Sequence, residues 1–137
     1  MGMQITLIQN EINVVGLTLR ESATYSSPNY VFAFINEFNK ENIVIFSATN
    51  SSYFTNRYDK FNIELVSATA SEDITLGKVI LSPNGQWLYN VYATDQIITA
   101  TFLGSFTYSI DPDPNAIETG KVVITGTNSN ITNDIYL

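Results

Sequence analysis

The sequence predicts an all-β domain, a β-sandwich of the immunoglobulin-like or jelly-roll-like kind with seven to nine short antiparallel strands. Short apolar segments, separated by turn residues, run along the whole chain. No window of helical length keeps apolar residues at the spacing of an amphipathic helix. The 137 residues fit one domain, which we expect over 1–125 with a short N-terminal arm, followed by a polar C-terminal tail over 126–137.

The first half of the chain holds three expected strands. Residues 12–19, INVVGLTL, alternate from Val15 onward, which is the spacing of a half-buried strand. Residues 30–38, YVFAFINEF, start apolar on both faces, as the central strand of a sheet does. The tetrad Asn39-Lys40-Glu41-Asn42 predicts a hairpin turn into a strand at 43–48.

The second half alternates most clearly in KFNIELV, residues 60–66, and in QWLYNVYA, residues 86–93. The Asn-Gly pair before the second of these favours a tight turn. Further strands are expected at 74–81, once or twice within 97–110, and at 121–125. The apolar faces of all these strands predict a core that includes Leu17, Leu19, Phe32, Phe34, Phe61, Ile63, Leu65, Trp87, Tyr89 and Val91.

Composition argues against several classes of function. The chain has neither Cys nor His, which excludes disulfides, thiolate chemistry and Ser-His-Asp or Cys-His catalysis. The formal net charge of −7 disfavours binding to nucleic acid. No apolar run reaches the roughly 18 residues of a membrane span, and the N-terminus lacks the basic and apolar regions of a secretory signal. We therefore expect a non-enzymatic protein that binds neither nucleic acid nor membrane.

Two polar loops, 21–30 and 49–59, carry the candidate binding residues. Aromatic side chains in loops often anchor protein interfaces because they bury a large area with few rotatable bonds. Such side chains also fold back and close the ends of sandwiches, and the sequence leaves both interpretations open. Two strands separate the loops, so both can lie at one end of the sandwich. The candidate interface residues are Tyr25, Tyr30, Tyr53, Phe54, Arg57 and Tyr58.

The acidic residues give weaker signals. Asp111, Asp113, Asn115 and Glu118 resemble the start of a calcium loop, but Ala116 stands where the loop needs Gly, and two prolines stiffen it. No metal or other cofactor is therefore expected. Carboxylate pairs for glycoside hydrolysis would come from Glu37, Glu41, Glu64, Glu72 and Asp73, which lie in turns or on polar strand faces.

Segments 13–66, 82–95 and 113–124 together resemble a family of small proteins from tailed phages of Bacteroidetes hosts, including crAss-like phages. The family pattern reads TLxExxTxxxPxYLFxFxN, SxYxxRYNKFxI, GxYxYxIYEQ and ETGKVxV. The matching residues here, in the same order, are Thr18, Leu19, Glu21, Pro28, Tyr30, Phe32 and Phe34; Ser52, Arg57, Tyr58, Lys60, Phe61 and Ile63; Gly85, Trp87, Tyr89 and Tyr92; and Glu118-Thr119-Gly120-Lys121-Val122. The third motif departs from the pattern at Tyr92-Ala93-Thr94, and 97–110 is more apolar than in the relatives.

The resemblance implies a structural virion protein, either a capsid accessory or decoration protein or a head-fibre element, assembled in the cytoplasm of the host bacterium. Its expected partners are the phage coat protein or other virion proteins, with self-association as a further expectation. The alternative is a carbohydrate-binding module for host attachment, in which exposed aromatic side chains stack on sugars. Trp87 is the one tryptophan, and its alternating strand predicts that it lies in the core instead.

A chelator tests the expectation that no metal is required. Because the 111–118 run lacks a complete ligand set, EDTA should leave the melting temperature unchanged. A fall of several degrees in EDTA that calcium restores would contradict this expectation.

Overall fold

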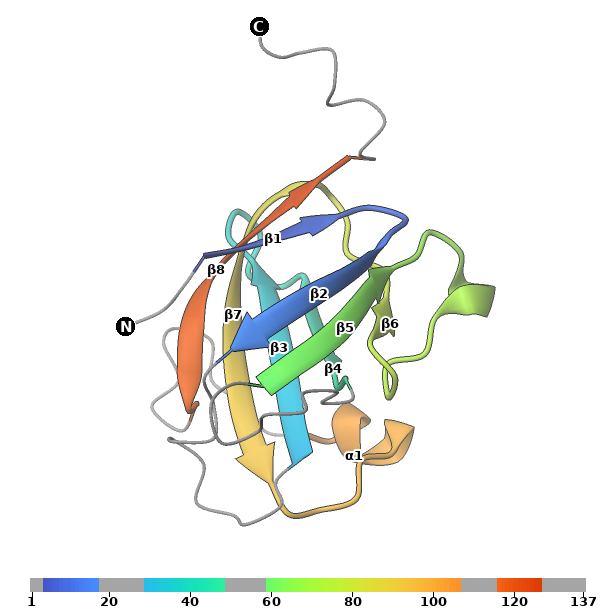
Figure 1. Ribbon diagram of the computed structural model, residues 1–137, viewed down its shortest axis with the longest axis vertical. Coiled ribbons are helices and arrows are strands. Elements are labelled where there is room, and N and C mark those ends of the chain that lie inside the picture. The colour runs from blue at the N-terminus through green and yellow to red at the C-terminus, as the bar shows by residue number, and fades with distance from the viewer. Residues whose placement is uncertain (1–3, 18–28, 49–58, 107–115, 127–137) are drawn as a thin grey trace, which may run out of the picture.

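The computed structural model describes residues 4–17, 29–48, 59–106 and 116–126. Two sheets face each other (Figure 1), which confirms the predicted all-β sandwich. The larger sheet has the order β1 (Gln4–Ile8), β8 (Glu118–Thr125), β7 (Gly85–Thr94), β3 (Asn29–Asn36) and β4 (Ile43–Phe46). The smaller sheet has the order β2 (Ile12–Leu17), β5 (Asp59–Leu65) and β6 (Lys78–Val79), and two short helices, η1 (Thr69–Ser71) and α1 (Ala100–Gly104), lie outside the sheets.

The order of the larger sheet and the pairing of β2 with β5 follow the immunoglobulin-like member of the two expected sandwich types, whereas β6, which comes after β5 and runs parallel to it, has no counterpart there. The neighbours β8, β7, β3 and β4 correspond to strands G, F, C and C′ of a variable-type domain, and β2 pairs with β5 as B pairs with E. The expectation of antiparallel strands holds for four of the six described pairings and is wrong for two. β1 runs parallel to β8, and β6 runs parallel to β5.

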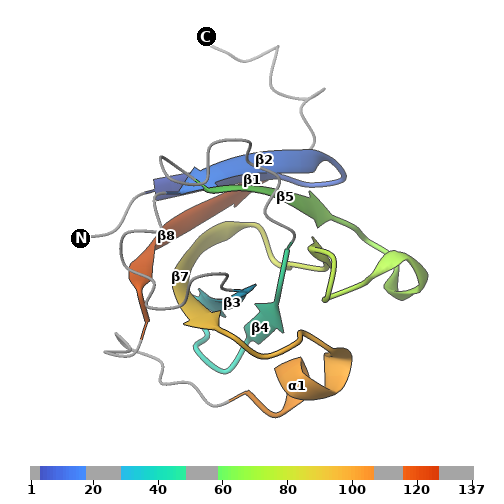
Figure 2. The ribbon, with the colours of Figure 1, turned by 60° about the horizontal axis from the view of Figure 1, so that its bottom comes forward.

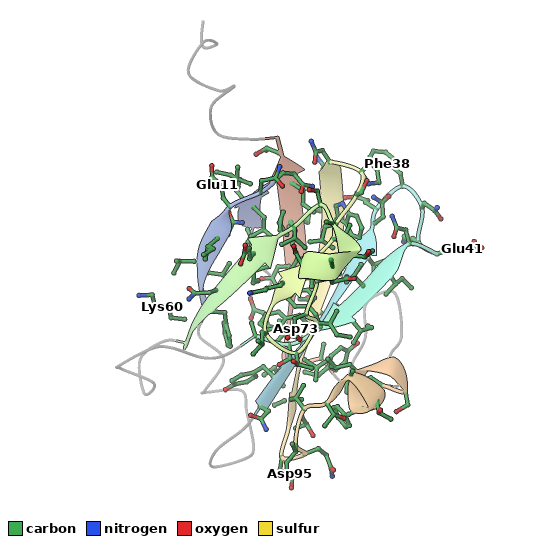
Figure 3. The ribbon with its side chains drawn as sticks, turned by 90° about the vertical axis from the view of Figure 1, so that its right-hand side faces the viewer. Glu11, Phe38, Glu41, Lys60, Asp73 and Asp95 are labelled. Atoms are coloured by element: carbon green, nitrogen blue, oxygen red, sulfur yellow. The ribbon has the colours of Figure 1, made fainter. Side chains whose placement is uncertain are left out.

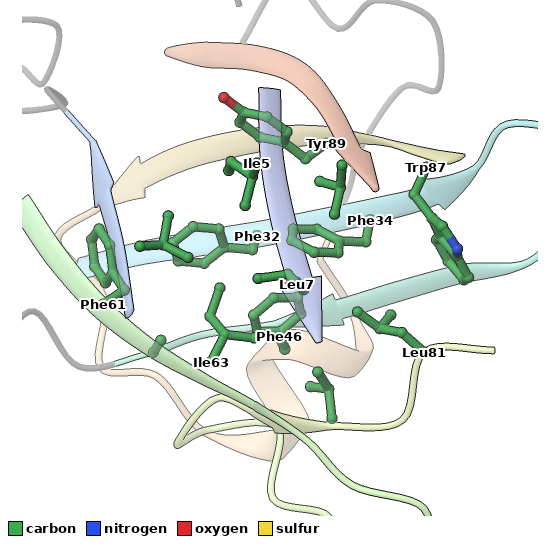
Figure 4. Packing of buried hydrophobic residues seen from close by; sticks show 14 of the residues in the cluster. Ile5, Leu7, Phe32, Phe34, Phe46, Phe61, Ile63, Leu81, Trp87 and Tyr89 are labelled. Carbon is green, nitrogen blue, oxygen red and sulfur yellow. The ribbon is translucent and has the colours of Figure 1, made fainter. Parts of the chain in front are cut away.

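The core between the sheets is built around aromatic rings (Figure 4). Phe61 of β5 meets both Tyr30 and Phe32 of β3 edge-on, with centroid distances of 5.6 and 5.1 Å. Phe32 also stacks on Phe46 of β4 at 5.3 Å. Since edge-on pairs favour defined orientations, the two contacts of Phe61 fix how the sheets face each other.

This core confirms the predictions drawn from the alternation of apolar and polar residues. Every predicted core residue whose side chain the structure describes is buried, namely Phe32, Phe34, Phe61, Ile63, Leu65, Trp87, Tyr89 and Val91. The side chain of Leu17 and all of Leu19 lie outside the described residues.

β3 is buried on both faces, as its continuous apolar run predicts. Its inward residues join the main core, while Val31 and Ala33 belong to a second cluster with Leu103 of α1. Figure 2 shows α1 beyond the larger sheet, on the side away from β2 and β5. The helix thus covers part of the outer face of that sheet.

The expectation of one or two strands within 97–110 is wrong for the described part of that segment. Residues 100–104 form α1, because the Thr99 hydroxyl caps the helix by accepting a 3.0 Å hydrogen bond from the Phe102 N–H. Burial of Leu103 against β3 then outweighs the strand propensity of the apolar residues around it.

The described part of the expected N-terminal arm is an edge strand. Residues 4–8 form β1, which buries Ile5 and Leu7 and pairs with β8. The Asn13 side chain fixes the end of β1, because its Oδ1 accepts from the Ile8 N–H and its Nδ2 donates to the carbonyls of Ile8 and Ile63. The arm therefore belongs to the sandwich; residues 127–137 of the predicted tail lie outside the described residues.

Phe34 offers a test of this core. Its ring is fully buried and contacts Phe46 edge-on at 4.9 Å and Tyr89 at 6.3 Å. Phe34→Ala should lower the free energy of unfolding by about 3–5 kcal/mol in a denaturant titration, because rings from both neighbouring strands limit collapse of the cavity. Phe38→Ala is the control: Phe38 is 87% exposed, and its loss should change stability by less than about 0.5 kcal/mol. Equal effects of the two substitutions would contradict this packing.

Candidate functional site

Six strand ends meet at one end of the sandwich, which we call the loop end. It comprises the ends of β2, β4 and β7 and the starts of β3, β5 and β8. Leu17 at the end of β2 pairs with Asp59 at the start of β5. In the larger sheet, Asn29 at the start of β3 pairs with Thr94 at the end of β7. The strand ends that flank loops 21–30 and 49–59 therefore lie at the same end, as the count of strands between them predicts.

Tyr30 corrects the candidate list. It is 3% exposed, and its ring packs against Phe61 in the main core. Its carbonyl accepts a 2.6 Å hydrogen bond from the Ser47 hydroxyl. Tyr30 shares the inward face of β3 with Phe32 and Phe34, so its side chain supports the loop end from beneath and is not available to a partner. The other candidates, Tyr25, Tyr53, Phe54, Arg57 and Tyr58, lie outside the described residues.

The described part of the loop end includes the segment that follows β7. The Asn29 side chain donates a 2.8 Å hydrogen bond to the Gln96 carbonyl, and the Gln96 N–H donates to the Thr94 hydroxyl at 3.1 Å. Next to this anchored turn, Ile97 is 81% exposed. Sequence reasoning missed Ile97 as a surface residue, because it placed the residue in a strand.

The opposite end, which we call the turn end, is closed by side-chain amides. Asn36 Oδ1 accepts hydrogen bonds from the N–H groups of Phe38 and Asn39 at 2.9 and 2.8 Å. Asn42 donates to the Ser82 carbonyl, and Gln9 donates to the Leu81 carbonyl. These bonds hold three connections together and leave Phe38 as the single large exposed apolar side chain of the β3–β4 turn.

Trp87 is unavailable for stacking on a sugar. Its side chain is fully buried in the main core, and its Nε1 donates a 3.1 Å hydrogen bond to the Pro83 carbonyl. The prediction that Trp87 lies in the core is therefore confirmed.

The described carboxylates are spread over the surface (Figure 3), with Glu11, Glu41, Asp73 and Asp95 in separate places. Within residues 4–17, 29–48, 59–106 and 116–126, no three acidic side chains gather into a set that could hold a metal ion. Of the residues whose sequence resembles the start of a calcium loop, only Glu118 is described, and its Oε2 accepts a 3.2 Å hydrogen bond from the Tyr89 hydroxyl.

Asp73 is the carboxylate with the clearest local partners. Its Oδ1 accepts hydrogen bonds from the Thr75 hydroxyl at 2.7 Å and from the Thr75 N–H at 3.1 Å. These two bonds, and then the charge of Lys78, lower the pKa of Asp73 below its ordinary value. The arrangement closes the turn before β6, which is a structural role.

None of the described helices has the length and apolar character needed to cross a lipid bilayer. Comparison of the chain with protein-family models, curated proteins and solved structures finds no match.

Thr75 provides a test of the Asp73 turn. Thr75→Val removes the hydroxyl donor and keeps the N–H donor, so the pKa of Asp73 should rise toward its ordinary value in a carboxyl NMR titration. A lowered pKa contributes stability above the unfolded-state value of about 3.9 that is lost as the pH falls through the lower, folded-state pKa. The variant should therefore lose less stability on acidification. The exposed Thr69→Val is the matched control, and an unchanged pKa in Thr75→Val would contradict the assignment.

Proposed function

We propose that the protein is a non-enzymatic virion component of a tailed phage that attaches to the coat protein, or to another virion protein, through the loop end. In this proposal it is a capsid accessory or head-fibre element assembled in the cytoplasm of the host bacterium. The observation that carries the binding part is that the strand ends flanking three connections meet at one end of a rigid sandwich.

The connectivity supports this choice of surface. The strand ends that flank β2–β3 and β7–β8 correspond to those around the B–C and F–G loops, and β4 ends where the C′–C″ loop begins; these three loops form the recognition surface of variable-type immunoglobulin domains. Loops held by a rigid scaffold are favoured sites of recognition. The analogy concerns the placement of the loops, and their sequences supply the chemistry.

That chemistry suits a protein partner. Residues 18–28 and 49–58 contain Tyr25, Tyr53, Phe54 and Tyr58 among Ser, Thr and Asn, together with Arg57. Tyrosine and arginine are enriched where interfaces bind most strongly, while Ser and Asn supply adaptable hydrogen bonds.

The phage assignment is supported by the resemblance of four ordered motifs. Several residues of the shared pattern are buried here, including Phe32, Phe61 and Trp87, so part of the pattern is explained by packing. Other pattern residues, among them Glu21, Arg57 and Tyr58, fall in the sequences of the two loops. The pattern thus includes both the core and the loops proposed to bind.

Alanine variants of the loops test the binding surface. Tyr53→Ala, Phe54→Ala and Arg57→Ala should each leave the melting temperature within a few degrees of the parent and reduce incorporation into purified phage particles, because interface anchors cost about 2 kcal/mol or more when truncated. Incorporation is measured by quantitative mass spectrometry of the particles. Phe38→Ala removes an exposed aromatic side chain from the turn end and should be incorporated normally.

Two outcomes would overturn the proposal. Particles that contain none of the chain would remove the virion role. If the melting temperature falls in step with incorporation, the loop residues only maintain the fold. Binding of the parent protein to a glycan array that the same loop variants lose would favour the carbohydrate-binding alternative.

A further inference from the structure

β2 forms an open edge of the smaller sheet and carries no charged side chain. Its six residues, INVVGL, pair with β5 on one side, and no described strand pairs with the other side. Figure 3 shows β2 along one margin of the molecule, with Glu11 and Lys60 near its two ends. Sheet edges normally carry charges, prolines or bulges that prevent further pairing. β2 has none of these charges or prolines.

The backbone groups that face outward follow from the pairing with β5. On the side of β2, the Leu65 N–H donates to the Glu11 carbonyl. On the side of β6, the N–H groups of Glu64 and Val66 donate to the carbonyls of Gly77 and Val79. In an antiparallel pair, residues whose backbone groups bond the partner strand alternate with residues whose backbone groups point away from it. Because Ile12 lies opposite Glu64, the N–H and C=O groups of Ile12, Val14 and Gly16 point away from β5.

The other edge strands that the structure describes are shorter than β2: β1 has five residues, β4 has four and β6 has two. The Asn13 side chain bonds both backbone groups of Ile8 at the edge of β1. Beside β4, the Ser47 N–H donates to the Ile74 carbonyl. β6 has two residues, one of them Lys78. Among the described edge strands, β2 is therefore the longest, with six uncharged residues and no described strand on its second side.

The side chains beside these backbone groups are apolar and exposed. Ile12 and Val14 are 62% and 59% exposed on the outer face, and Gly16 follows on the same face. Across the pairing, Glu64 lies beside Ile12, Asn62 beside Val14, and Lys60 beside Gly16.

We propose that β2 pairs antiparallel with β2 of a second copy of this chain, centred on Val14. A two-fold axis perpendicular to the sheet makes two copies of one strand antiparallel. Centring on Val14 places Val14 against itself and Ile12 against Gly16 of the other copy, so every outward-facing residue meets another. With two main-chain hydrogen bonds at each pair, about six bonds join two three-stranded sheets into one.

The outer face is self-complementary in this register. Ile12, the larger of the two exposed apolar side chains of β2, packs over Gly16 of the second copy, which has no side chain to obstruct it. Across the four strands at the centre of the dimer, Glu64 and Ile12 of one copy lie in line with Gly16 and Lys60 of the other. Opposite charges therefore stand at the two ends of this line of side chains. The central row is uncharged, with Asn62 beside Val14 in each copy. Like charges are not brought together, which favours a second copy as the occupant of this edge.

One strand from each copy makes a small interface, below about 1,200 Å². We therefore expect a dimer that dissociates on dilution, with a Kd between about 10 µM and about 1 mM. This surface is distinct from the loop end, so dimerisation and attachment to a virion protein can be tested separately.

Sedimentation velocity over that concentration range tests the proposal. The parent chain should shift from monomer to dimer as concentration rises. Val14→Lys places two like charges together at the axis and should weaken dimerisation by at least about tenfold. Asn62→Lys adds the same charge on the same face, one strand away from the edge, and should dimerise like the parent. Circular dichroism confirms that each variant is folded.

A mixing experiment tests the register. Val14→Lys and Val14→Glu should each be monomeric, and an equimolar mixture should form a heterodimer because residue 14 lies opposite itself. A parent chain that stays monomeric throughout the range would overturn the proposal. Undiminished dimerisation of Val14→Lys, or a mixture that remains monomeric, would also overturn it.

Discussion

The contact of Phe61 with Tyr30 and Phe32 is the constraint on which the rest of the sandwich depends. One ring from the smaller sheet is held edge-on by two rings from the larger sheet, so β5 and β3 cannot slide past each other without losing both contacts. A shift of one residue in β5 would also turn its apolar side chains toward solvent. The contact lies directly beneath the loop end, because Tyr30 is the second residue of β3 and Phe61 the third of β5. The same packing that joins the sheets therefore sets the distance between the strand ends that flank the two candidate binding loops.

Local patterns predict strands well where one face is buried against the opposite sheet. Phe61, Ile63 and Leu65 alternate with polar residues because β5 has one solvent-exposed face, and Val31 to Ile35 are continuously apolar because β3 has none. Two elements escaped this reasoning. The alternation of Ile5 and Leu7 was present in the sequence, but the partner of β1 lies more than a hundred residues away, and a local pattern does not reveal a long-range parallel pairing. The apolar residues around Leu103 resemble a strand because the second cluster, which is what they bury, forms only after the larger sheet exists.

For the candidate site, the structure describes the flanking strand ends and one residue, Tyr30. Counting strands places the two loops at one end, since each strand reverses the direction of the chain. The position of Tyr30 at a loop boundary suggests an interface residue. Its spacing of two residues from Phe32, and of four from Phe34, places it on the same inward face of β3, and this spacing predicts its burial correctly. The exposed Ile12 and Val14 were not singled out as a surface, because alternation assigns residues to faces but does not say which strand is left at an edge. That depends on the whole strand order.

The parallel pairing of β1 with β8 has a mechanical consequence. Gln4 pairs with Lys121 and Ile8 with Thr125, so the chain enters this strand pair near the loop end and leaves it at the turn end. A pull applied to the chain before Gln4 and after Thr125 would act along the two strands in opposite directions. Their hydrogen bonds would then be sheared together, whereas in an antiparallel hairpin they would be unzipped one at a time. Tension applied in this way would pass through β1 and β8, while the core strands β3 and β7 would stay out of the line of force.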